Sequence, residues 1–202
     1  MNETAYRYFI VNKPYDMVSQ FVSTHKVKLL GNLDFNFPAG THAVGRLDNH
    51  SEGLLILTTN KKVTRLLFEG DTPHKRTYLV QVNNILSNEN LYLLQTGITI
   101  RVKGGKDYVT PPCNVTIIEN PDKIFKTASD RKQYGPNSWL LITLREGKFH
   151  QVRKMIGAVR LRCKRLIRVS IEGLVLGDLQ PGSVCEIEEK NFFRQLKIAV
   201  PP

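Results

Sequence analysis

Short segments with strand character recur along the whole chain and outnumber the helical segments. Alternating or continuous apolar runs typical of strands occupy residues 7–14, 41–45, 53–59, 76–82, 98–102, 114–119, 139–147, 163–170 and 184–189. Helical periodicity predicts helices only over 61–69, 88–97, 149–159 and 191–199. Strands and helices do not alternate regularly, which predicts an α+β fold with a mixed, mostly antiparallel sheet. The 202 residues suit a single domain over 1–202, within which two tightly joined subdomains would also fit.

Local signals predict where several of these elements begin and end. Asn60 and Ser87 are N-cap residues of the first two helices, and Gly97 ends the second. One face of the third helix gathers the apolar residues Val152, Met155, Ile156 and Val159. Residues 119–138 are polar and rich in turn formers, which predicts a long surface loop.

The chain is strongly basic, with a formal net charge of +11. The excess is concentrated between Arg145 and Arg168, where nine basic residues accompany one acidic residue, Glu146, for a net charge of +8. One-sided charge of this size repels itself without a partner, so it indicates a polyanion, and RNA or DNA before a membrane. A merely solvated charged face is the alternative interpretation.

Three widely spaced cysteines, Cys113, Cys163 and Cys185, form no CxxC pair. This pattern argues against a disulfide framework or a zinc site and is typical of a reducing compartment, so we expect a cytoplasmic protein. The N-terminal residues lack the apolar core of a signal peptide, and no apolar run is long enough to span a bilayer. We therefore expect no membrane association.

One motif places charges directly before an apolar run. In "GRLDNHSEGLLILTT", Arg46 and Asp48 lie two residues apart, so on a strand they would share a face. A salt-bridged structural aspartate is the commoner explanation of such a pair, and a functional acid is the other. Tyr78, in an alternating strand, is likewise more often a core residue than a catalytic one.

A second motif, "LREGKFHQVRKMI", leads from a strand into a helix. Gly147 makes a turn, and the helix start would present backbone N–H groups to an anion. Lys148, His150 and Arg153 lie near that start, which makes it a candidate phosphate-binding site. Arg153 falls outside the apolar face and would point to one flank, where a carboxylate could meet it; a surface arginine is the alternative.

Five segments together resemble a known family: "NKPYDMVSQF", "GRLDNHSEGLLILTTN", "RTYLVQV", "WLLITLREGKFHQVRKMIG" and "RLIRVSIEGLVLGDLQPGSV". They resemble the pseudouridine synthases, in particular the branch that modifies bacterial ribosomal RNA, from about residue 8 to residue 189. The resemblance implies the family's catalytic fold, a curved mixed sheet with an RNA-binding cleft. The small N-terminal S4 domain that many members carry is expected to be absent.

The resemblance also implies the reaction, which is an isomerisation. Uracil is cut from ribose at N1, turned on a flipped-out nucleotide and rejoined through C5. The expected partner is ribosomal RNA, most of all 23S, and neither a cofactor nor a metal is needed. A monomer is expected.

The resemblance further assigns roles to single residues. Asp48 matches the catalytic carboxylate, Tyr78 the tyrosine that stacks on uracil and takes the C5 proton, and Arg153 the cation that keeps the acid ionised. Arg46 matches the arginine beside the flipped-out nucleotide, and Leu166 an apolar residue that packs against the base or the tyrosine. Further RNA contacts are expected from Lys13, Arg76, Lys148, His150 and Lys154.

The sequence departs from the family pattern at four basic positions, which bears on substrate choice. Arg76 stands where lysine is frequent, Lys148 and His150 where arginines are frequent, and Arg160 where glycine is usual.

Two other classes of function stay open. A non-catalytic RNA-binding or ribosome-assembly protein would need the arginines but would have no use for an acid facing phosphates. A nuclease or deaminase would need a paired histidine or carboxylate site or a zinc cluster, whereas the histidines here are scattered at His25, His42, His50, His74 and His150.

Overall fold

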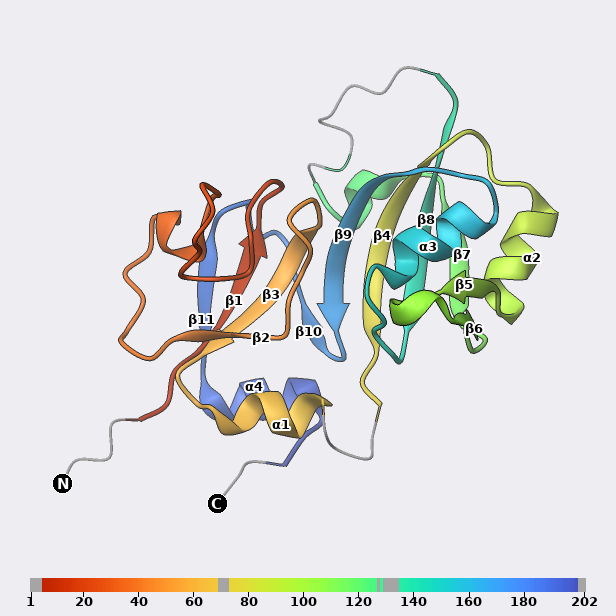
Figure 1. Cartoon of the computed structure of the whole chain (residues 1–202). Coiled ribbons are helices and arrows are strands. Elements are labelled where there is room, and N and C mark those ends of the chain that lie inside the picture. The colour runs from red at the N-terminus through yellow and green to blue at the C-terminus, as the bar shows by residue number, and fades with distance from the viewer. Residues whose placement is uncertain (1–4, 69–72, 127, 129–134, 200–202) are drawn as a thin grey trace. The chain divides into compact units, whose positions relative to one another are not determined.

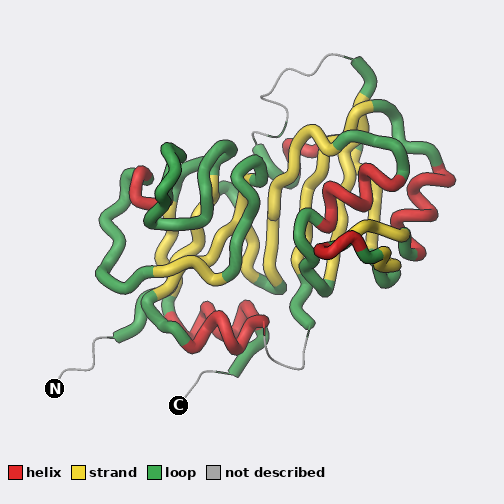
Figure 2. Tube along the Cα trace, viewed as in Figure 1, coloured by secondary structure: helices red, strands yellow, loops and turns green. Residues whose placement is uncertain are grey.

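The computed structural model describes residues 5–68, 73–126, 128 and 135–199 (Figure 1). Within these residues the chain forms four α-helices and eleven β-strands, and it divides into two compact units. Unit 1 comprises residues 1–74 and 170–202, and unit 2 comprises residues 75–169. Strands predominate over helices in both units (Figure 2), and the strand registers are antiparallel, which confirms the α+β class.

Unit 1 is built on a small sheet with β1 at its centre. Its elements are β1 (Tyr8–Lys13), the 3-10 turn η1 (Leu30–Asn32), β2 (His42–Val44), β3 (Glu52–Thr58), α1 (Lys62–Phe68), β10 (Leu174–Val175), β11 (Val184–Ile187) and α4 (Glu189–Leu196). Strand β1 pairs with β11 on one side and with β3 on the other, and β2 pairs with β3. Each strand predicted in this unit is present, whereas β10 was not predicted.

Both faces of β1 and β3 are buried, which explains why these strands are continuously apolar instead of alternating. On one face Phe9 and Leu57, which are register partners, belong to a core that includes Leu47 from the β2–β3 connection. On the other face the ring of Tyr8 lies 4.5 Å from that of Phe192 in α4, centroid to centroid. In Figure 1 both α1 and α4 are drawn below these strands. A strand covered on both faces has no solvent side to carry polar residues.

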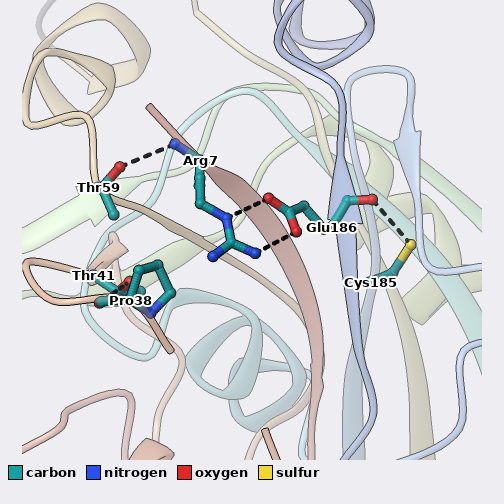
Figure 3. Close-up of polar contacts among 6 residues, drawn as sticks. All are labelled: Arg7, Pro38, Thr41, Thr59, Cys185 and Glu186. Atoms are coloured by element: carbon teal, nitrogen blue, oxygen red, sulfur yellow. Dashed lines mark hydrogen bonds and ion pairs between the residues drawn. The ribbon is translucent and has the colours of Figure 1, made fainter. Parts of the chain in front are cut away.

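An exposed ion pair joins the beginning of β1 to β11 (Figure 3). The Arg7 guanidinium donates two hydrogen bonds of 2.6 Å to the carboxylate of Glu186, and this hydrogen bonding, together with the positive charge, lowers the pKa of that carboxyl. The Arg7 backbone N–H donates to Oγ1 of Thr59, which follows β3. Arg7 thus connects the start of β1 to β11 and to the residue that follows β3. An exposed ion pair, however, adds little to the free energy of folding.

Unit 2 contains strands in the order β9-β4-β8-β7, in which β4 and β7 each run antiparallel to β8. Its elements are β4 (Arg76–Asn83), α2 (Asn88–Thr96), β5 (Thr99–Arg101), η2 (Lys103–Gly105), β6 (Asp107–Val109), β7 (Asn114–Ile118), η3 (Pro121–Lys123), β8 (Asn137–Leu144), α3 (Gln151–Ala158) and β9 (Cys163–Ile171), whose last two residues belong to unit 1. Strands β5 and β6 form a separate hairpin around η2. Strand β6 was not predicted.

The core of unit 2 lies between its sheet and the helices α2 and α3. Register pairs β4 residue Val80 with Leu140 of β8, and both belong to one buried cluster. The predicted apolar face of α3 is confirmed, because the same cluster contains Val152, Met155, Ile156 and Val159. Helix α3 is thereby fixed over the sheet that carries Tyr78.

The predicted helix caps are confirmed. Oδ1 of Asn60 accepts a hydrogen bond from the Lys62 N–H, and Oγ of Ser87 accepts one from the Asn90 N–H. Gly97 ends α2 with a φ of +113°, and a Cβ there would lie 2.4 Å from the carbonyl oxygen of Thr110, so only glycine fits.

The prediction of a long surface loop over residues 119–138 is wrong in part. Asn137 and Ser138 already belong to β8, and Pro121, Phe125 and Ala128 are buried. Phe125 lies under the guanidinium of Arg165, 5.5 Å from its ring centroid, and Nη1 of Arg165 donates to the Ala128 carbonyl. The polar composition predicts a loop correctly, but a few anchors hold it to unit 2.

Candidate functional site

Arg46 and Asp48 lie in the connection between β2 and β3, and not on a strand. Between them, Leu47 is buried in the core of unit 1, while Arg46 is exposed and Asp48 is half-buried. The prediction that Arg46 and Asp48 would share a strand face therefore does not apply, because no strand runs through residues 45–51. Their location in a connection, next to a fixed strand, is common for functional groups.

The backbone around Asp48 is held on both sides. Oγ of Ser19 donates to the carbonyl of Leu47 at 2.9 Å and accepts from its N–H at 3.0 Å. The N–H of Ser51 donates to the carbonyl of Asp48 at 3.0 Å. Gly45 begins this segment with a φ of +72°, and a Cβ there would lie 2.8 Å from Cζ of Phe68 in α1. These contacts hold the backbone of the connection on both sides of Asp48.

Lys13 has a different role from the one predicted for it. It was predicted to bind RNA, but it is fully buried in unit 1. Its ammonium donates to the backbone carbonyls of Pro14, Met17 and Asn49, at 2.9, 2.6 and 3.3 Å. A buried cation needs such partners because burial removes its water. Lys13 thus links the segment after β1 to the residue that follows Asp48.

Two further contacts join the same pair of segments. Nδ2 of Asn49 donates to the Asp16 carboxylate at 3.0 Å, and the rings of Tyr15 and His50 stack with centroids 5.2 Å apart. The segment 14–17 therefore packs along residues 48–50, and its contacts hold the turn that carries Asp48. The motif "NKPYDM" carries the signal for this contact, although the sequence did not show which residues it meets.

In unit 2, Tyr78 and Arg76 occupy the same face of β4. Tyr78 pairs with Ile142 and Arg76 with Leu144, at the end of the sheet where β8 leads into α3. Tyr78 is half-buried and packs against the core cluster that contains Leu166. The predicted pairing of Leu166 with the tyrosine is thus compatible with the core of this unit. Arg76 is buried, and its Nη1 approaches Gly147 in the turn after β8.

The turn between β8 and α3 is held by two polar residues that the sequence did not single out. The buried amide of Gln151 accepts from the Lys148 N–H at 2.8 Å and donates to Glu146 at 2.6 Å. The second Glu146 oxygen accepts from the Tyr108 hydroxyl at 2.6 Å, which raises the pKa of Tyr108. The motif "EGKFHQVR" contains both Glu146 and Gln151, but the sequence did not show that they hold this turn.

The basic side chains of this turn come from the same end of unit 2. Lys148 is exposed with its ammonium 5.0 Å from the Tyr108 ring centroid, and Lys154 lies 5.4 Å from that of Phe149. His150 precedes α3 in a left-handed conformation, with a φ of 55°. Burial raises the pKa of the Cys163 thiol to about 11, and the positive charge of the half-buried Arg153 opposes this rise. Unit 2 therefore gathers Arg76, Tyr78, Lys148, His150, Arg153 and Lys154 around the end of β8 and the start of α3.

The basic stretch from Arg145 to Arg168 is not a single outward surface. Arg165 and Arg168 are buried in β9, whereas Arg160, Arg162 and Lys164 are exposed. Part of the charge excess is thus internal, and the remainder lies at the ends of α3 and β9.

Among the residues that the structure describes, no group of three metal-binding side chains is close enough to hold a metal ion. In the same part of the chain, no helix has both the length and the apolar character needed to cross a membrane.

Comparison with known proteins agrees with the motifs. A family model described as RNA pseudouridylate synthase matches residues 7–158. Ribosomal large subunit pseudouridine synthase E of Vibrio vulnificus (strain CMCP6) is 37% identical over 179 residues, which cover 88% of this chain and 74% of the relative. The protein of the same name from Xanthomonas campestris pv. campestris is 33% identical over 182 residues, covering 86% of this chain and 91% of the relative.

A solved structure described as pseudouridylate synthase has the same fold. It superposes with a TM-score of 0.76 at 23% identity, over 95% of this chain and 74% of that one. At this identity the match speaks for the fold alone, which confirms the architecture expected from the motifs.

Proposed function

The chain belongs to the RNA pseudouridylate synthase family, whose members isomerise uridine in RNA to pseudouridine, and from this we propose which residue and which RNA take part in the reaction. We propose that Asp48 is the catalytic carboxylate and that large-subunit ribosomal RNA is the substrate. The substrate rests on the relatives, whose names assign them to the large ribosomal subunit. The role of Asp48 rests on one observation above all. The carboxylate stands on a turn whose backbone is held from both sides, by Ser19 and by Lys13.

A fixed carboxylate suits this reaction because the bond changes occur within one nucleotide. The bond between N1 and C1′ breaks, the bond between C5 and C1′ forms, a proton leaves C5 and N1 gains one. Asp48 acts while ionised, as the glycosidic bond breaks. Arg153 is proposed to be the basic partner of this carboxylate during the reaction. No electrons are gained or lost overall, so we also propose that no cofactor is required.

Tyr78 is proposed to stack on the uracil and to take the C5 proton, and Leu166 to pack behind it. Both belong to or pack against one core cluster, which supports a shared task. Arg46 is proposed to occupy the space of the flipped-out nucleotide, since it is exposed and only two residues from Asp48. Flipping costs a few kcal/mol, and a side chain that fills the gap offsets part of that cost.

Lys148, His150 and Lys154 are proposed to contact the RNA, whereas no RNA contact is proposed for Arg76, because it is buried. The three residues lie around one turn of unit 2, and Lys148 is exposed. We further propose that the enzyme acts as a monomer in the cytoplasm. Its ribosomal substrate and its three free thiols, Cys113, Cys163 and Cys185, fit a reducing compartment.

The experiment that tests the proposal is tritium release from C5 of uracil. Unmodified large-subunit ribosomal RNA carrying the label is incubated with the wild type, with Asp48→Asn and with Asp34→Asn. Asp34 is an exposed aspartate of the same unit, so its replacement removes the same charge away from the motif. We expect release by the wild type and by Asp34→Asn, and a loss of at least about 1000-fold in Asp48→Asn, equivalent to about 4 kcal/mol of barrier.

Binding separates the chemistry from the substrate. Asp48→Asn is expected to bind the RNA as the wild type does. Turnover by Asp48→Asn at the wild-type rate would remove this residue from the reaction. An inactive wild type that still binds RNA with a steep salt dependence would point instead to a protein that only binds.

A further inference from the structure

Phe149 exposes its apolar ring at the centre of the basic turn between β8 and α3. Its relative exposure is 67%, whereas the apolar residues that follow in α3 are buried. The ring is not part of the hydrophobic core cluster of unit 2. None of the roles proposed above uses it.

The neighbours of this ring are cationic or aromatic. The rings of Phe149 and His150 stack with centroids 3.8 Å apart and an interplanar angle of 18°. The ammonium of Lys154 lies 5.4 Å from the Phe149 centroid. Aromatic faces combined with cations are the surface on which single-stranded nucleic acids stack their bases, with the cations meeting the adjacent phosphates.

Hydrogen bonds connect the two residues that flank the Phe149–His150 pair. The Gln151 N–H donates to the Lys148 carbonyl at 3.1 Å, and the Gln151 side chain connects the Lys148 N–H to Glu146. These hydrogen bonds enclose Phe149 between two fixed residues. A prearranged aromatic surface loses little conformational entropy on binding, so its contact energy appears largely as affinity.

We propose that the Phe149–His150 pair is a stacking platform for an unpaired base of the RNA substrate, other than the uridine that is modified. This inference rests on the proposed function in taking ribosomal RNA as the ligand. It adds a stacking contact for a neighbouring base to the phosphate contacts of Lys148 and Lys154. The platform thereby helps to select sites where an unpaired base lies near the target.

The test compares the RNA affinity of Phe149→Leu, Phe149→Trp and Tyr92→Leu with that of the wild type. The probe is unmodified, in vitro transcribed large-subunit ribosomal RNA. Tyr92 is a matched control, since it is an aromatic residue of the same unit, 64% exposed, on α2. We expect Phe149→Leu to raise Kd about tenfold, within the range of one lost base stack, and the other two variants to stay within about twofold of the wild type.

Salt dependence and fluorescence identify the contact as stacking. The slope of log Kd against log salt should stay unchanged in Phe149→Leu, because no phosphate contact is lost, but should fall by about one in Lys154→Gln. In Phe149→Trp the RNA should quench the new tryptophan, whereas the wild type has only Trp139, which is buried. An unchanged Kd in Phe149→Leu, or no quenching in Phe149→Trp, would overturn the inference.

The same experiment distinguishes this inference from the proposed function. If the wild type releases tritium and Phe149→Leu binds and turns over normally, the platform is wrong and the function stands. If the wild type releases no tritium while Phe149→Leu still loses affinity, the platform stands and the proposed substrate or chemistry is wrong. Since the ring is exposed, its replacement leaves the core of unit 2 intact.

Discussion

At the scale of single residues, some basic side chains stabilise the fold and others are exposed to solvent. Lys13 and Arg165 are buried and donate to backbone carbonyls, whereas Lys148 and Arg46 are exposed. Charge alone predicted a polyanionic partner correctly for the chain as a whole. It did not separate the cations that stabilise the fold from those able to reach RNA.

Replacement of Lys13 by methionine tests its internal role. Methionine keeps an unbranched chain but offers no donor to the carbonyls of Pro14, Met17 and Asn49. We expect Lys13→Met to lower the free energy of unfolding by about 1–3 kcal/mol, as for buried polar groups that lose a partner. We also expect kcat to fall more than KM rises, because the turn behind Asp48 is released. Urea unfolding and tritium-release kinetics measure the two effects.

Lys26→Met is the control for this change, since Lys26 is exposed in the same unit. It should leave both the unfolding midpoint and kcat as in the wild type. Equal behaviour of the two methionine variants would show that the buried ammonium does not hold the turn.

At the scale of elements, caps and periodicity predicted helices better than composition predicted loops. Ser87, Gly97 and the apolar face of α3 act as predicted, because each signal concerns residues within one or two helical turns. The segment 119–138 did not, because its buried anchors meet residues of β9 that are far away in sequence. Strands β6 and β10 were missed, although β2 and β5, which have only three residues each, were predicted.

Helix α2 offers a clean test at this scale, because it carries no proposed site residue. Ser87→Ala removes the side-chain acceptor of the Asn90 N–H. We expect the free energy of unfolding to fall by about 1 kcal/mol, while Ser87→Asp keeps the wild-type value. Urea unfolding of the three proteins measures this, and tritium release should be the same in all of them. A stability of Ser87→Ala equal to that of the wild type would exclude a contribution of the cap.

At the scale of the whole molecule, the chain leaves unit 1 after His74 and returns to it at Ser170. Strand β9 runs continuously through the second of these boundaries. The single domain over residues 1–202 stays a prediction, and we expect it to show as one cooperative unfolding transition.

Trp139 makes this expectation measurable, because it is the single tryptophan and lies in unit 2. Its fluorescence reports on unit 2, whereas far-ultraviolet circular dichroism reports on helices and strands of both units. The two signals should give the same urea midpoint and the same dependence of the unfolding free energy on urea concentration. A fluorescence transition displaced from the circular dichroism transition would mean that the units unfold as separate domains.

The class of fold, most of the strands and helices, and the motifs that identify the family could all be predicted from the sequence. Those features are local, since periodicity, caps and short motifs act between residues that are neighbours along the chain. The three-dimensional packing was needed to show that Lys13 is internal, that Arg165 anchors a loop and that Phe149 is exposed. Burial and exposure depend on partners far away in sequence, such as Asn49 for Lys13 and Ala128 for Arg165, and no local pattern encodes them.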